Sequence, residues 1–254
     1  MATFCGSALF VLAMLAISYA LNRVHHDELI QKATPVTPQS VPALARLVDD
    51  CAARLQSGTV RTYVAPGATL NAYTFGLVQP QVVVVYAGVL QIMDADELRF
   101  ILGHELGHVR LGHTWLNSLV GGMAGIPSPY LAAVVLYFSF RWWNRACEYS
   151  ADRAGLLACG KPDKAASALV KLVGGVAALR SAGERRQLLQ RIEAEDDRLE
   201  NNLGELLSSH PMIVRRLQAL REYAVTPEYR RLQAQANSLH PIREPDRSGN
   251  GPVR

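Results

Sequence analysis

Two periods of apolar residues divide the chain into helical and extended segments. Over residues 42–55 and again over 94–111, apolar residues recur at three- and four-residue steps, which predicts helices with one buried face. Between these helices, residues 60–65, 71–75 and 81–86 favour strands, and the last contains four consecutive valines, typical of a buried strand. The pattern predicts an α+β, mostly helical fold with a small β-sheet beside the helix at 94–111.

The second half of the chain carries mainly helical patterns. Helices are expected over 144–158, from 162 onward, over the charged stretch 181–207, and over 210–223. Proline, arginine, asparagine and glycine are frequent after residue 232 and predict a disordered tail over 233–254. One folded domain is therefore expected over 42–232.

An uncharged apolar run over residues 4–21 is just long enough to span a bilayer. A signal peptide is the alternative, because Ser18-Tyr19-Ala20 is an acceptable cleavage site. No Lys or Arg precedes the run, whereas Arg23 follows it, which favours a membrane anchor over 1–21 with the next domain on the cytoplasmic side. A polar linker is expected over 22–41.

The strongest chemical signal is His104-Glu105-Leu106-Gly107-His108, which reads H-E-x-x-H. It lies on the helix predicted at 94–111, where Asp94 and Glu97 form an expected capping box. One helical turn separates the two histidines, so both side chains point the same way and can bind one zinc ion. Glu105 then lies beside the metal, where it can act as a general base towards water.

A catalytic zinc site needs a third protein ligand and one open position. The extended motif with a third histidine is absent, since Leu111 and Thr114 stand where Gly and His would be required. His113 is out of phase on the helix and is expected to face away. Glu148, on a later predicted helix, is the natural third ligand, and Asp152 one turn on can accept a hydrogen bond from a ligand histidine.

An uncharged stretch between these two helices closes on Arg141-Trp142-Trp143, residue types expected at a headgroup boundary. A single membrane crossing would separate the two histidines from Glu148 by about 30 Å of hydrocarbon. The chain is therefore expected to return through an apolar hairpin over 117–143 that turns at Pro127-Ser128-Pro129. The hairpin either lies in the membrane interface or packs as a buried hairpin.

Charge and cysteine content argue against other classes of protein. The net charge is +4 with Lys and Arg scattered along the chain, so no nucleic-acid partner is expected, whereas a lipid membrane is. The four cysteines form no C-x-x-C pair, which argues against a thiolate zinc site. Neither G-x-x-x-x-G-K nor G-x-G-x-x-G occurs, so no nucleotide site is indicated.

The chain resembles the gluzincin metalloendopeptidases of the CaaX-prenyl-protease and HtpX heat-shock-protease group. The resemblance covers about residues 42–223 and is carried by the H-E-x-x-H motif and by Glu148 to Gly155. Asn71-Ala72-Tyr73, similar to the family's Asn-Ala-Phe strand, and Ser209-His210-Pro211 with Arg216 support it.

This resemblance implies a zincin-like metalloprotease core with one Zn²⁺ per chain. The implied roles are metal ligand for His104, His108 and Glu148, general base for Glu105, oxyanion stabiliser for His210, substrate contact for Asn71, and support of the ligands for Asp152 and Arg216. Arg215 stands beside Arg216 and is an alternative for its role.

The expected function is that of a membrane-associated zinc endopeptidase acting on polypeptides, in the processing or quality control of membrane proteins. A catalytically inactive zinc-binding scaffold or chaperone-like membrane protein is the main alternative. Structural zinc sites normally have four protein ligands, and only three good ones are visible here. A non-proteolytic zinc hydrolase is a third possibility.

Overall fold

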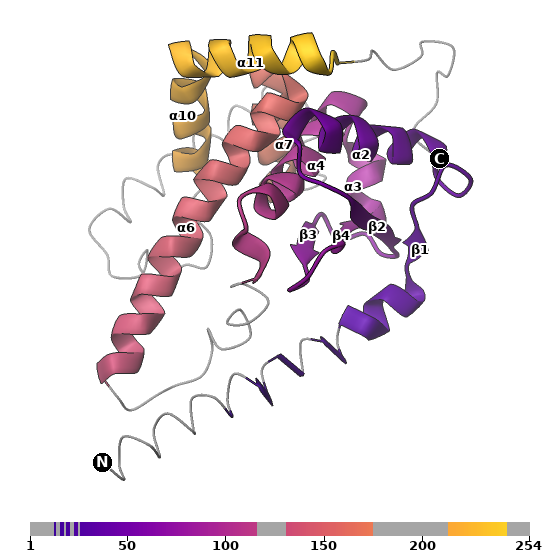
Figure 1. The fold of residues 1–254 in the computed structure, drawn as a ribbon, viewed down its shortest axis with the longest axis vertical. Coiled ribbons are helices and arrows are strands. Elements are labelled where there is room, and N and C mark those ends of the chain that lie inside the picture. Colours follow the sequence, from indigo (N-terminus) through magenta and orange to yellow (C-terminus); the bar gives the residue numbers. More distant parts are fainter. Residues whose placement is uncertain are drawn as a thin grey trace.

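The computed structural model describes residues 13, 16–17, 19–20, 23–24, 26–115, 131–174 and 213–242. Its elements are, in order, β1 (Thr34–Pro35), α2 (Pro42–Leu55), β2 (Val60–Ala65), β3 (Ala72–Phe75), β4 (Gln81–Tyr86), α3 (Ala87–Ile92), α4 (Ala95–Arg110), α6 (Leu131–Cys159), α7 (Pro162–Gly174), α10 (Ile213–Ala224) and α11 (Pro227–Leu239). The long helix α6 runs past α4, and α10 and α11 lie at its C-terminal end (Figure 1). The expected mostly helical fold with a small sheet is confirmed.

The sheet has the strand order β1-β2-β4-β3, with β2 parallel to β4 and β3 antiparallel to it. The predicted valine strand is its buried centre, and its side chains alternate between two apolar clusters. Val83 and Val85 join the main core with the helices, whereas Val84 faces the other way. Thr74 on the edge strand β3 pairs with Val83 and so lies on the face that α4 covers.

Helical residues 26–32 cover the outer face of the sheet. Leu29 and Ile30 pack against the cluster around Val84, and the ring of His26 stacks on Phe75 with 3.7 Å between ring centroids. The segment predicted as a polar linker over 22–41 therefore contains a helix and β1. Its few apolar residues form this structure because the aromatic outer face of the sheet gives them a surface to pack on.

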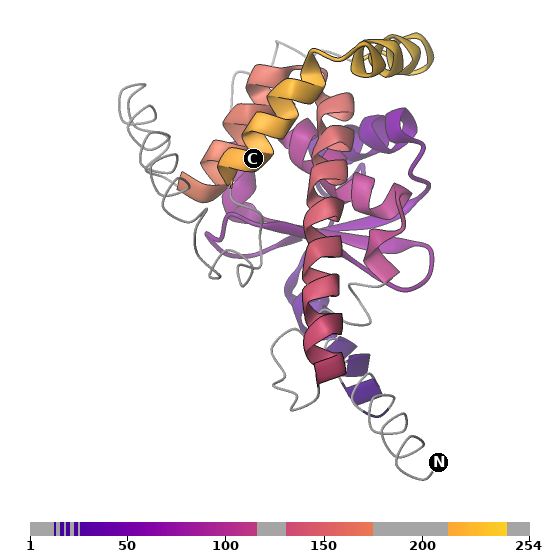
Figure 2. The ribbon, with the colours of Figure 1, turned by 90° about the vertical axis from the view of Figure 1, so that its left-hand side faces the viewer.

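Close packing of α4 against α6 brings the two predicted metal-binding helices together (Figure 2). A Cβ atom at Gly103 would collide with the Cβ of Ala158 and lie 3.0 Å from the Cα of Gly155. A Cβ at Gly155 would lie 2.8 Å from the carbonyl oxygen of Phe100. The two backbones approach this closely because glycine stands at the crossing on both helices.

The start of α4 is fixed by the predicted capping box. Asp94 accepts hydrogen bonds from the amides of Asp96 and Glu97, and Glu97 accepts one from the amide of Asp94. The Glu97 carboxylate is buried and also accepts from Ser167 and Lys171 of α7, at 2.7 and 2.6 Å. One side chain thus caps α4 and joins it to α7, which sets the axial position of the metal-binding turn.

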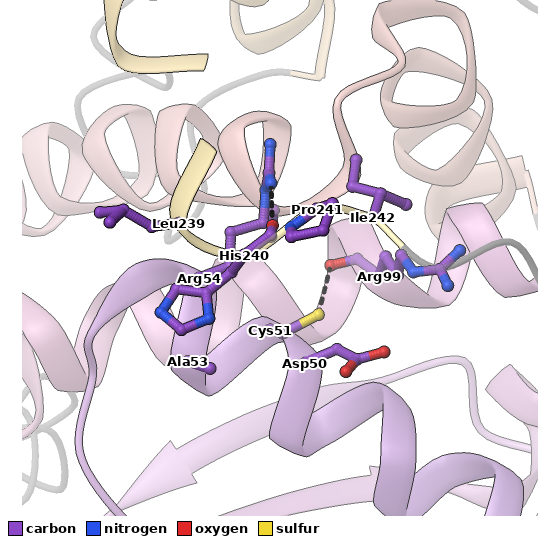
Figure 3. A pocket seen from close by; sticks show the side chains of 10 residues that line it. Asp50, Cys51, Ala53, Arg54, Arg99, Leu239, His240, Pro241 and Ile242 are labelled. Carbon is purple, nitrogen blue, oxygen red and sulfur yellow. Dashed lines mark hydrogen bonds between the residues drawn. The ribbon is translucent and has the colours of Figure 1, made fainter. Parts of the chain in front are cut away.

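The C-terminal part of the chain is folded further than its composition predicts. Thr226 caps α11 by accepting from the amide of Tyr229, and the helix runs to Leu239. Arg54 of α2 donates to the carbonyl oxygens of Leu157 and His240. Arg54 and His240 both line a small pocket at the end of α11 (Figure 3). A disordered tail from residue 233 is therefore wrong for 233–242, because Arg54 and the apolar side of α11 hold them.

The helix that carries Glu148 begins at Leu131 and not at Asn144, so Trp142 and Trp143 lie inside it. The first arm of the predicted hairpin and its Pro127-Ser128-Pro129 turn lie outside the described residues. In the described part of the chain, no helix combines the length and apolar character needed to cross a membrane. Most of the apolar run at 4–21 lies outside that part.

Gly103→Ala is expected to lower the free energy of unfolding by about 1–3 kcal/mol, because the new methyl group overpacks the contact between α4 and α6. Helix propensity alone predicts the opposite sign, a gain of up to about 1 kcal/mol. Denaturant unfolding of the metal-free protein shows whether the substitution destabilises or stabilises the fold. Ala158→Gly in the same chain should restore part of the loss, and a stabilised single variant would contradict the role of the crossing.

Candidate metal centre

The predicted ligands converge where α4 crosses α6. Nε2 of His104 lies 3.2 Å from Nε2 of His108, and each of these atoms lies 3.6 Å from a carboxylate oxygen of Glu148. Two ligand atoms that each lie about 2.1 Å from a tetrahedral zinc ion are about 3.4 Å apart. The two histidine nitrogens are therefore spaced for one ion of that size, and the Glu148 carboxylate faces both, with Oε2 towards His104 and Oε1 towards His108. Both histidines are buried, and Glu148 is nearly so.

His104 is held by a carboxylate on its far side. Its Nδ1 lies 2.9 Å from Oδ1 of Asp152, one turn after Glu148 on α6. A carboxylate only accepts hydrogen bonds, so this contact places the proton of a neutral His104 ring on Nδ1 and leaves the lone pair of Nε2 directed at the centre. The sequence predicted this contact from the four-residue spacing of Glu148 and Asp152.

Arg216 of α10 joins the two carboxylates. It donates through Nε and Nη2 to Asp152, at 2.7 and 2.6 Å, and its Nη1 lies 3.0 Å from Glu148. Burial alone would raise the pKa of Asp152, but the Arg216 charge and its hydrogen bonds lower it overall. Arg216, the buried one of the two adjacent arginines, makes these contacts with Asp152 and Glu148.

The expectation that His113 faces away from the site is wrong. Its Nδ1 lies 3.0 Å from Nδ1 of His108, and its side chain is buried. The helical phase that predicted the opposite does not apply, since α4 ends at Arg110 and Gly112 takes a left-handed conformation with φ of 74°. A histidine placed just beyond a glycine was the only sequence signal for this contact.

Glu105 lies on the same turn as the two histidines and is bound by the edge strand. The Thr74 hydroxyl donates to Oε2 of Glu105 at 2.7 Å. Burial raises the pKa of Glu105, although the His104 charge and the Thr74 hydrogen bond oppose that rise. A carboxyl whose pKa is raised suits a general base. The sequence analysis did not identify Thr74, because its contact depends on how β3 packs against α4.

Two further predicted residues lie apart from this cluster. Asn71 is exposed directly before β3, and its carbonyl oxygen accepts from the amide of Tyr86. His210 lies outside the described residues. The described part of the site therefore contains three convergent donor atoms, a buried carboxyl beside them, and the side chains that orient them.

Comparison with known proteins agrees with this geometry. Residues 38–224 match the family model described as peptidase family M48, a range that contains every predicted site residue. The chain belongs to peptidase family M48. As an M48 peptidase it is a metallopeptidase, and the family implies a bound metal ion.

Similar M48 proteins include HtpX-type proteases. The chain is 28% identical to a protease HtpX homolog of Moorella thermoacetica, over 90% of this chain and 87% of that protein. It is also 28% identical to a protease HtpX homolog of Ralstonia pickettii, over 87% of each. A plastoglobule-localized metallopeptidase 48 of Arabidopsis thaliana is 29% identical over 69% of this chain and 55% of that protein. The expected family resemblance is thus confirmed.

Arg216→Met in this M48 peptidase is expected to lower the free energy of unfolding by about 3–5 kcal/mol, because two buried carboxylates lose their countercharge. Arg216→Lys should recover little of this, since an ammonium cannot make the two parallel bonds to Asp152. Chemical denaturation measures both. Arg215→Met, at a half-buried neighbouring position, is the control and should cost less than about 1 kcal/mol; equal losses at 215 and 216 would contradict the assignment.

Proposed function

We propose that this M48 peptidase is a zinc-dependent endopeptidase in which His104, His108 and Glu148 bind one Zn²⁺. The observation that carries the proposal is that the two Nε2 atoms, 3.2 Å apart, face the Glu148 carboxylate, each at 3.6 Å from one of its oxygens, beside the buried Glu105. When bound, zinc would polarise the scissile carbonyl and lower the pKa of water to about 7.

The chain's own residues supply the proton transfers. Glu105 takes a proton from the attacking water and later gives it to the leaving amine. Thr74 holds Oε2 of Glu105, so the carboxylate keeps one orientation while its other oxygen handles the proton. His210, given this role by the family resemblance, would stabilise the negative charge that develops on the substrate oxygen.

An extended polypeptide is the substrate form that the sheet favours. β3 is an edge strand that pairs with β4 on one side, and Thr74 links it to Glu105. A peptide that adds to β3 as another strand, on the side away from β4, would pass along the turn that carries the general base. Asn71, exposed at the start of this edge, would contact such a substrate.

Membrane association is the second part of the proposal. It rests on the apolar run at 4–21, followed by Arg23, and on Trp142 of α6, a residue that is 68% exposed. The proposed arrangement is an N-terminal anchor with the peptidase domain on the cytoplasmic side. Membrane proteins would then be the natural substrates, in processing or quality control.

The alternative of an inactive zinc-binding scaffold has less support. A structural zinc ion is normally enclosed by four protein ligands. Among the described residues, the group that could hold a metal consists of two histidines and one glutamate, and a buried carboxyl with a raised pKa lies next to it. An inactive scaffold would not require the carboxyl group of Glu105 beside the metal.

Glu105→Gln should retain zinc and lose cleavage of unfolded casein by at least about 100-fold, because an amide cannot accept the proton from water. Zinc content by elemental analysis and casein turnover are measured on the same preparation. Glu222→Gln makes the same chemical change on the exposed side of α10 and is the control. Full activity in Glu105→Gln would refute the proposed role of Glu105.

Thr74→Val should lower kcat about 10- to 100-fold with little change in KM, because it removes a hydrogen bond to a charged group without changing side-chain shape. Thr74→Ser restores the hydroxyl and should recover most of kcat. Steady-state cleavage of a fluorogenic peptide gives both constants, and zinc content should stay equal in all three proteins. An unchanged kcat in Thr74→Val would show that the hydroxyl does not assist Glu105.

A further inference from the structure

The two histidines of the motif are oriented by chemically different partners. Asp152, a charged carboxylate, holds His104, whereas His113, a second imidazole, lies against His108 with 3.0 Å between the two Nδ1 atoms. His108 and His113 are 7% and 9% exposed, so water is largely excluded from this contact. Each neutral imidazole carries one ring proton, so the contact fixes the tautomers of both rings.

The direction of the hydrogen bond follows from the metal centre. Nε2 of His108 is directed at His104 and Glu148, so its lone pair is needed there and the ring proton sits on Nδ1. His108 therefore donates from Nδ1, and Nδ1 of His113 accepts. The proton of His113 then lies on Nε2, the atom on the other side of its ring.

Three features of the fold hold His113 in this position. The chain turns back after α4 because Gly112 adopts φ of 74°, a conformation that favours glycine. Thr114, which directly follows His113, is buried and hydrogen-bonds to Gln81 at the start of β4. The ring of Trp143, from α6, meets the ring of His113 edge to face with 6.0 Å between centroids.

We propose that His113 is a positioning residue for the metal, fixing the tautomer and ring orientation of His108 through the bond between their Nδ1 atoms. The inference rests on the proposed zinc site of His104, His108 and Glu148. The turn after α4 then does more than end the helix, because it places the Nδ1 acceptor of His113 next to the ligand His108. Partners of this kind typically change metal affinity 10- to 100-fold when they are removed.

The test compares three substitutions that differ in where they place an acceptor. Asn carries an oxygen at the position of Nδ1, Gln carries its amide farther out near the position of Nε2, and Leu carries no acceptor. Competition with a chromogenic chelator gives the zinc dissociation constant of each purified full-length protein. His113→Leu and His113→Gln should bind zinc about 10- to 100-fold more weakly than wild type, and His113→Asn within a few-fold of it.

Controls separate this role from general stability. Thermal unfolding of each metal-free variant reports packing alone, and His240→Leu makes the same change at an exposed residue after α11. If His113→Leu does not fold, the Asn and Gln pair still decides, because both are polar and only one places an acceptor at Nδ1. Equal zinc affinity for Asn and Gln, or for Leu and wild type, would overturn the inference.

The outcome is distinguishable from failure of the proposed function. A wild-type protein that binds zinc but cleaves no peptide would refute the endopeptidase proposal and leave the affinity series intact. A wild-type protein that cleaves casein, with no affinity difference across the series, would refute the role of His113 alone.

Discussion

The site depends on the close contact between α4 and α6. Two donor atoms come from α4 and one from α6, and they must lie about 3.4 Å apart to share a tetrahedral ion. Gly103 and Gly155 remove the side chains that would hold the helices apart. The capping box and the bonds from α7 to Glu97 then fix α4 along its axis. Packing thus determines the geometry of the site before any metal binds.

The charges around the three donor atoms also favour binding of a cation. Among the described residues around the three donor atoms, the carboxyl groups of Glu105, Glu148 and Asp152 outnumber the one guanidinium, that of Arg216. Burying an excess of negative charge is costly unless a cation compensates it. By formal charge, three carboxylates and one guanidinium leave an excess of two negative charges, which a divalent ion would balance. Arg216 is therefore best understood as the group that orients Asp152 and Glu148 while leaving the centre negative.

Local sequence patterns predicted the parts of the site that lie on regular helices. His104 and His108, and Glu148 and Asp152, are each one turn apart, and that spacing carries over directly into the structure. The valine strand and the Asp94 capping box were also predicted correctly, because each depends only on residues that are close together in the sequence.

Contacts between distant elements could not be read in this way. His113 was misplaced because its position depends on the left-handed turn at Gly112 rather than on helical phase. Thr74 meets Glu105 only through the packing of the edge strand on α4. The folded end of the chain at 233–242 and the helix at 26–32 form because other elements offer Arg54 and an aromatic sheet face. The composition of a segment does not show which distant residues it will pack against.

X-ray absorption at the zinc K-edge of the purified protein tests the central claim most directly. The account predicts about one zinc ion per chain with four light ligands: two imidazole nitrogens at about 2.0–2.1 Å, a carboxylate oxygen at about 2.0–2.2 Å, and one oxygen from solvent. A sulfur shell at about 2.3 Å, a third or fourth imidazole, or a folded protein without zinc would contradict it.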